Sequence, residues 1–337
     1  MLTKLGQWAD RTVAPWSPWT PVVGTVRSLL AIAMALTLLT NDATDLFPAV
    51  PGPGLTPPYC FGVRHLAPFC LVNTSGLEWA RWFCIVALVL VASGYRPRIT
   101  GLLHVWVAFG FQASSPLLDG GDQVTAVLAL LLLPVTLTDP RRWHWDPPPI
   151  QRAPAAQVVT RVALGLARLQ VAGIYFHAAV GKATVEDWAN GTALYYWTRH
   201  PLVGATGWSA SLLAPLTLNA VSLSLLTWGV VALEFALAGG LIAGPRLRRA
   251  LLAAGVLLHL GILVIHGLVS FSLVMIAALV LYLHPVHQPF AWPAFLERLA
   301  RRPRGGAAPG VSPAPAADPD RWLPEHPPGQ RPRPSCP

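Results

Sequence analysis

The chain has 337 residues, of which 53% are hydrophobic and only 12% charged, and its mean hydropathy is +0.49. This composition excludes a soluble enzyme of this length and indicates a protein that crosses a membrane several times. The formal charge of +9 comes almost wholly from arginines in short loops and in the C-terminal tail, a distribution that membrane topology explains better than nucleic-acid binding.

Consecutive apolar runs predict an all-α fold, a polytopic bundle of transmembrane helices. A helix needs roughly 20 mostly apolar residues to cross about 30 Å of hydrocarbon. The run at 249–284 would measure about 54 Å as a single helix, so we divide it into two spans near Gly267. About eight spans result, within a range of roughly six to eight, from the runs at 22–40, 78–95, 99–117, 123–138, 157–181, 219–244 and the two halves of 249–284.

The predicted domain organisation follows from these spans. Residues 1–20 form a cytoplasmic or interfacial lead-in that contains three tryptophans, and residues 21–285 form the membrane domain. Residues 286–302 form an amphipathic juxtamembrane segment, and the Pro-rich residues 303–337 form a disordered cytoplasmic tail.

Arginine placement predicts that both ends of the chain lie in the cytoplasm. With this orientation every inner loop carries an excess of arginine, as the positive-inside rule requires. The inner arginines are Arg96, Arg98, Arg141, Arg142, Arg152, Arg246, Arg248, Arg249 and those within 298–304. The outer side then receives the segments 41–77, 118–122 and 182–215. We therefore expect a multi-pass protein of the plasma membrane.

Two cysteines, Cys60 and Cys70, lie in the first outer segment. An oxidising exterior allows them to form a disulfide that closes a short loop. The alternative is a pair of free thiols in an apolar loop, and the residues alone leave both possibilities open.

Four polar residues recur every seven positions along the fifth span, namely Arg161, Arg168, Tyr175 and Lys182. Seven residues are nearly two helical turns, so the four side chains form one stripe along the helix. An ionisable group at membrane depth costs roughly 3 kcal/mol on insertion scales. We therefore expect the stripe to face protein or a water-filled cavity, with Arg161 reaching the cytoplasmic interface.

Each charged member of the stripe has a structural and a functional interpretation. We expect Arg168 to pair with Glu234, the carboxylate deep within a predicted helix, and this pair either holds helices in register or forms part of a site. Lys182 either extends to the outer surface and pairs with Glu186, four residues later, or works as a base, because a partly desolvated lysine gives up its proton more readily.

Other candidate site residues lie near Lys182 or on the seventh span. Tyr175 and His177 precede the lysine, and Glu186, Asp187 and Trp188 follow it. His259 and His266 are seven residues apart and share one helix face, although lone histidines on apolar helices are more often packed than functional. The four cysteines show no metal-ligand spacing.

The residues around Lys182 resemble a known family. Residues 175–200 read YFHAAVGKATVEDWANGTALYYWTRH, and this run is similar to the core motif of the HTTM family, the transmembrane domain shared by vitamin K-dependent gamma-carboxylase and the sporulation-delaying protein B family. Supporting similarity covers TLTDPRRWHWD at 136–146, LEFALAGGL at 233–241 and LHLGILVIHGLVSFSLVM at 258–275.

The resemblance implies a role for individual residues. In the carboxylase the corresponding lysine deprotonates reduced vitamin K, which implies that Lys182 is a base acting on a membrane quinol of the vitamin K or menaquinol type. His144 lies near a family histidine and is the second implied catalytic residue. The sequence shows no counterpart of the large lumenal region in which the carboxylase holds its protein substrate, so the resemblance favours the sporulation-delaying protein B group.

Three functions remain open at this point. The first is maturation or export-linked processing of a secreted antimicrobial peptide, which the resemblance to the sporulation-delaying group implies, together with a small partner protein and a peptide precursor. The second is a quinol-dependent enzyme with carboxylase- or epoxidase-like lyase chemistry. The third is a transport or structural protein without catalysis. All three place the protein in the lipid bilayer, and none involves nucleic acid.

Overall fold

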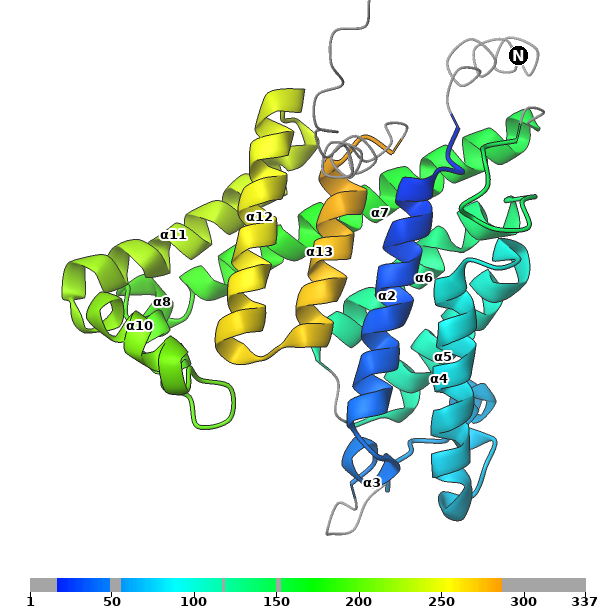
Figure 1. Ribbon diagram of the computed structural model, residues 1–337, viewed down its shortest axis with the longest axis horizontal. Helices are drawn as coiled ribbons and strands as arrows, with labels where there is room; N and C mark the ends of the chain where they lie inside the picture. Colours follow the sequence, from blue (N-terminus) through cyan, green and yellow to red (C-terminus); the bar gives the residue numbers. More distant parts are fainter. Residues whose placement is uncertain (1–16, 49–55, 117–118, 150–152, 287–337) are drawn as a thin grey trace, which may run out of the picture. The chain divides into compact units, whose positions relative to one another are not determined.

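The computed structural model describes residues 17–48, 56–116, 119–149 and 153–286, which form helices and connecting loops without a strand (Figure 1). The predicted juxtamembrane segment and tail lie outside the described residues, apart from Val286. The long helices are α2 (Pro21–Thr40), α4 (Leu77–Ser93), α5 (Pro97–Ser114), α6 (Gly120–Leu137), α7 (Pro154–Ala183), α10 (Gly207–Leu218), α11 (Ala220–Ala238), α12 (Pro245–His266) and α13 (Val269–Leu283). The short elements are α3 (Ala43–Leu46), η1 (Gly62–Leu66), η2 (Pro68–Cys70), η3 (Thr74–Gly76), α8 (Glu186–Ala189), α9 (Ala193–Thr198) and η4 (Gly239–Leu241).

The long helices confirm the predicted polytopic bundle. Within the described ranges, 6 helical segments are long and apolar enough to cross a membrane, and they correspond to α2, η3 with α4, α6, α7, α11 with η4, and α12. The 18-residue α5 and the 15-residue α13 occupy the two remaining predicted spans.

The long apolar run near the C-terminus is divided where the sequence predicts. Helix α12 ends at His266, and Gly267 then adopts a φ of +69°, in the left-handed region that glycine enters at little cost. Helix α13 begins at Val269. The two helices form an antiparallel hairpin whose turn joins their lower ends in Figure 1.

Helix α2 lies at the centre of the membrane domain. It packs against α4, α6 and α13, and 61% of its apolar window is buried. By contrast, only 22% of the apolar window of α11 and 17% of that of α12 are buried. Their outward side chains, such as Val221, Leu225 and Leu257, are large and apolar, which suits contact with lipid. A site beneath α11 and α12 is therefore covered by only one layer of helices.

Contacts between loops identify the two ends of the bundle. The backbones of Tyr95 and Trp143 form an isolated bridge, which joins two arginine-bearing loops. We call this the inner end, after the predicted orientation, and the opposite end the outer end. At the outer end a disulfide joins Cys60 to Cys70, and the adjacent Phe69 ring lies 4.9 Å from that of Phe47.

Candidate functional site

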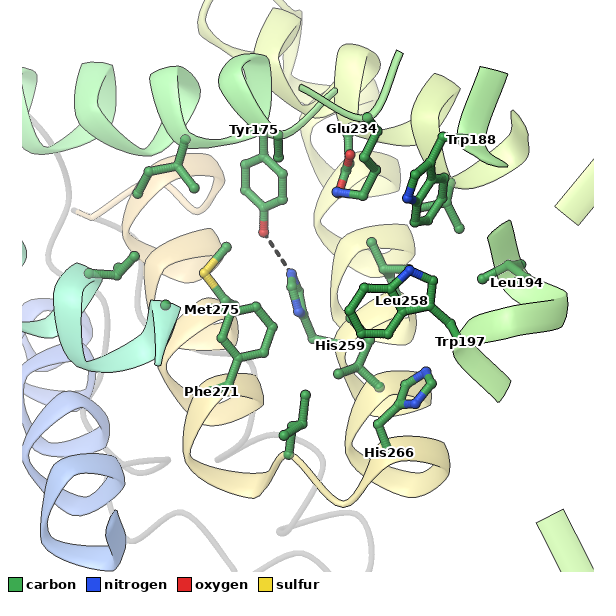
Figure 2. Close-up of a pocket in the computed structure, with 18 residues that line it drawn as sticks. Tyr175, Trp188, Leu194, Trp197, Glu234, Leu258, His259, His266, Phe271 and Met275 are labelled. Atoms are coloured by element: carbon green, nitrogen blue, oxygen red, sulfur yellow. Dashed lines mark hydrogen bonds and ion pairs between the residues drawn. The ribbon is translucent and has the colours of Figure 1, made fainter. Parts of the chain in front are cut away.

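A cavity of about 420 Å³ opens among α7, α11, α12 and α13 in the outer half of the bundle, and we call it the outer cavity (Figure 2). Most of its wall is apolar. The polar or aromatic side chains that line it are Tyr175, Lys182, Trp188, Trp197, Glu234, His259, His266 and Phe271.

The polar stripe of α7, whose four residues are spaced seven positions apart, supplies two of these lining residues. Tyr175 and Lys182 line the outer cavity, whereas Arg161 and Arg168 line a second cavity nearer the inner end. All four residues lie on one side of the 30-residue helix and face a cavity, as expected for polar side chains at membrane depth.

Lys182 forms an ion pair with Glu234 of α11. Its Nζ donates a hydrogen bond to Oε1 of Glu234 at 2.8 Å, and the exposed fractions of the two side chains are 25% and 9%. The ammonium also lies 5.3 Å from the centre of the Trp188 ring, within the range of a cation–π contact. The second carboxylate oxygen, Oε2 of Glu234, is buried and finds no hydrogen-bond partner among the described residues.

This pairing corrects two expectations from the sequence. Glu234 pairs with Lys182 and not with Arg168, whose Nε instead donates to the carbonyl of Tyr282 at 3.0 Å. Lys182 also does not pair with Glu186, which is exposed on α8. The reason is that α7 and α11 pack against each other, so that Glu234 is presented to the outer part of the stripe.

A second polar pair faces the same cavity. The hydroxyl of Tyr175 and Nε2 of His259 are 2.9 Å apart, as the dashed line in Figure 2 marks, and both residues are buried. The other ring nitrogen, Nδ1 of His259, is buried without a partner in the described part of the chain. Phe271 packs edge-on against the imidazole, with 5.7 Å between the ring centres. The cavity thus holds hydrogen-bonding capacity that the described residues leave unused.

Aromatic residues border the outer cavity on the side of α8 and α9. Figure 2 shows Trp188, Trp197 and Leu194 opposite Met275 and Phe271. His266 is held there by its Nδ1, which lies 2.7 Å from the carbonyl oxygen of Val203. These walls suit a ligand with an apolar body.

Three other predicted residues lie away from this cavity. His177 is exposed on α7 and does not line the outer cavity. It lies two positions from Tyr175, which is about 200° around the helix. Glu186 and Asp187 form the exposed first turn of α8 and do not line the cavity, whereas the next residue, Trp188, does.

His144 lies at the inner end and lines a different, small cavity. Its ring packs against Gly24 and Gly94, and its Nε2 is 3.4 Å from the hydroxyl of Ser28. Burial, followed by the positive charges of Arg27 and Arg141, lowers the pKa of His144 to about 3. The imidazole is therefore neutral near pH 7, and it packs between α2 and the C-terminal end of α4, in a different cavity from Lys182.

Arg27 is a buried residue that the sequence analysis missed. It is 2% exposed, and its Nη2 donates a hydrogen bond to the hydroxyl of Thr100. The signal was available, because an arginine inside the first apolar run requires a protein partner at membrane depth. The aromatic wall residues Trp197 and Phe271 were also missed, since nothing in their local pattern distinguishes them from packing.

Chemically, the outer cavity can hold an apolar molecule and exchange a proton with it. The ammonium of Lys182 donates a hydrogen bond to the carboxylate of Glu234, and the Tyr175 hydroxyl and the His259 ring add a second hydrogen-bonded pair on the same wall. No group of three or more His, Cys, Asp or Glu side chains suited to a metal occurs among the residues that the structure describes.

Comparison with known proteins identifies relatives that match about four-fifths of the chain. The chain is 36% identical to the sporulation-delaying protein SdpB of Bacillus subtilis (strain 168) over 279 residues, which cover 81% of this chain and 84% of SdpB. The chain belongs to the SdpB family. It is also 38% identical to the uncharacterized protein YitO of the same organism over 283 residues, or 82% of this chain and 90% of YitO. No family model and no solved structure matches the chain.

Proposed function

We propose that this member of the SdpB family takes part in the maturation or export-linked processing of a secreted antimicrobial peptide at the plasma membrane, and that the outer cavity is its working site. The observation that carries the proposal is the Lys182–Glu234 ion pair at 2.8 Å on the wall of an apolar cavity. Similarity to SdpB along more than four-fifths of the chain supports the peptide pathway.

The residues of the outer cavity have distinct roles in this proposal. Trp188, Trp197 and Phe271 hold an apolar segment of the peptide precursor against the cavity wall. Lys182 binds or protonates a polar group of that segment at its Nζ atom, and Glu234 balances the charge. A small partner protein and the precursor itself are the expected partners, and they approach from the outer end.

The experiment compares secreted peptides by mass spectrometry from cells that express the wild-type chain, Lys182→Ala or His177→Ala. His177 is the matched control, because it is a polar residue of the same helix that does not line the outer cavity. We expect the mature peptide to disappear only in Lys182→Ala, at equal membrane levels of all three proteins. Unchanged secretion in Lys182→Ala would exclude Lys182 from the peptide pathway.

A second candidate is favoured by the two polar pairs that face one apolar cavity. We propose as an alternative that a membrane quinol of the vitamin K or menaquinol type binds there, in agreement with the HTTM resemblance. The bound quinol would supply the redox chemistry of a carboxylase- or epoxidase-like reaction. A proton that passes from Nζ of Lys182 to Oε1 of Glu234, 2.8 Å away, leaves a neutral amine that can accept a hydroxyl proton.

The two candidates differ in what the purified protein retains. Solvent extraction followed by mass spectrometry should recover a quinone in near-stoichiometric amount if the second candidate holds. The variant Phe271→Ala, which removes an aromatic wall, should then lose the quinone, whereas His177→Ala should keep it. Recovery of no quinone from the wild-type chain would leave peptide processing as the function of the outer cavity.

A further inference from the structure

A second, larger cavity lies nearer the inner end, between the first half of α7, the start of α12 and the end of α13. Its volume is about 970 Å³, and we call it the inner cavity. Arg161, Arg168, Arg248 and Arg249 line it, together with His284. No carboxylate is found among the described residues that line it. The cavity therefore gathers the positive charges of Arg168, Arg248 and Arg249, and its described lining supplies no carboxylate to balance them.

Two of these arginines are held by hydrogen bonds to backbone carbonyls. These bonds orient the guanidinium groups and leave their positive charge available to a ligand. Arg168 uses its Nε to donate to the carbonyl of Tyr282 at 3.0 Å. Arg248 donates from Nε to the carbonyl of Gly240 at 3.1 Å and from Nη2 to that of Leu241 at 2.7 Å. Carbonyl partners orient a guanidinium without cancelling its charge.

Two further features strengthen the attraction for an anion. The charges of Arg168 and Arg248 are close enough to repel each other, and a bound anion would relieve that repulsion. Helix α12 begins at the cavity with Pro245 and has no side-chain cap, so its N-terminal dipole points positive charge toward the same space.

The remaining wall is apolar, formed by leucines of α7, α12 and α13 (Leu164, Leu252, Leu281 and Leu283). A free inorganic anion would make no apolar contact with this wall. A lipid would place its phosphate among the arginines and its acyl chains along the leucines. The inner end is also where the arginine count predicts the cytoplasmic leaflet.

We propose that the inner cavity is a binding site for the phosphate head group of an anionic membrane lipid. The site is separate from the outer cavity, and it does not depend on the function proposed for Lys182. Its ligand enters head-group first at the inner leaflet and bridges α7 to the α12–α13 hairpin.

The test measures lipid binding to the purified full-length chain by native mass spectrometry. Phosphatidylglycerol and phosphatidylcholine with the same acyl chains are titrated separately. Each arginine near an anionic lipid contributes about five-fold in affinity, or about 1 kcal/mol. We expect phosphatidylglycerol to bind at least about ten-fold more tightly than phosphatidylcholine, with the preference falling as salt rises.

Variants locate the site. Arg249 is exposed and forms no hydrogen bond or ion pair with another described residue, so Arg249→Gln should fold normally and weaken the binding of phosphatidylglycerol about five-fold. The double variant Arg168→Gln/Arg249→Gln should weaken it about twenty-five-fold. Arg246→Gln is the matched control, because Arg246 is an exposed arginine of the same helix turn that does not line the inner cavity.

Three results would overturn the proposal. Equal binding of the two lipids would remove the charge argument, and equal effects of Arg249→Gln and Arg246→Gln would remove the location. Inorganic phosphate is added in a separate arm. If it displaces phosphatidylglycerol completely at millimolar concentration, the cavity is a site for a soluble anion and not for a lipid.

Discussion

The ion pair between Lys182 and Glu234 should stabilise the fold as a unit, and a double-mutant cycle measures this coupling. Removing one partner of a fully buried pair costs about 3 to 5 kcal/mol, because the other charge is left unpaired. Lys182 keeps 25% of its side chain exposed and Glu234 only 9%, so water offsets part of the cost, and it offsets more for the lysine.

The two single substitutions should therefore be unequal. Lys182→Met leaves the more buried carboxylate, whose Oε2 already lacks a partner in the described structure, and should cost about 2 to 3 kcal/mol. Glu234→Gln leaves a lysine that can extend toward outer water and should cost about 1 to 2 kcal/mol. The double variant should cost little more than Lys182→Met alone, which gives a coupling of about 1 to 2 kcal/mol.

The assay is reversible unfolding of the purified chain in mixed detergent micelles. A parallel cycle between Lys182→Met and Glu186→Gln is the control, because Glu186 is exposed and forms no ion pair with Lys182. A coupling with Glu234 below about 0.5 kcal/mol, which is the range of independent sites, would refute the pairing.

Further predictions concern the inner end and the outer loop. Gly94→Ala should lower the unfolding free energy by about 2 kcal/mol or more, because φ there is +85° and the added Cβ would meet the ring of His144; a loss below about 0.5 kcal/mol would contradict that contact. Since folding lowers the pKa of His144 from 6.5 to about 3, the unfolded chain binds the proton first as pH falls. Stability should drop by about 2 kcal/mol between about pH 7 and about pH 5, and His144→Gln should lose this slope in pH-dependent unfolding. Replacing Cys60 and Cys70 by serine should lower the free energy of unfolding by about 2 to 3 kcal/mol, because it opens a loop with a sequence separation of 10. A wild-type chain whose stability does not change when a reductant is added would contradict this prediction.

Much of the fold could be predicted because span formation depends on local composition. The apolar runs specify the long helices, and Gly267 marks the turn between α12 and α13. The repeat of Arg161, Arg168, Tyr175 and Lys182 specifies one helix face, and all four residues line cavities.

The partners of these residues could not be predicted in the same way. Periodicity tells which side chains of α7 share a face, but it does not tell which helix packs there. Glu234 was assigned to Arg168 because both were expected deep in the membrane, yet the packing of α11 brings it to Lys182. The position of the His144 ring could not be predicted for the same reason, because the ring packs against Gly94, which lies 50 positions earlier in the sequence.

Filling the outer cavity tests the central claim most directly, because it leaves the ion pair in place. Ala178 lines the cavity, whereas Val180 is exposed on the same helix. Secreted peptides are compared by mass spectrometry from cells expressing Ala178→Phe or Val180→Phe at equal membrane levels. Loss of the mature peptide in Ala178→Phe alone is the predicted result. Normal secretion from both variants would contradict the assignment of the outer cavity as the working site.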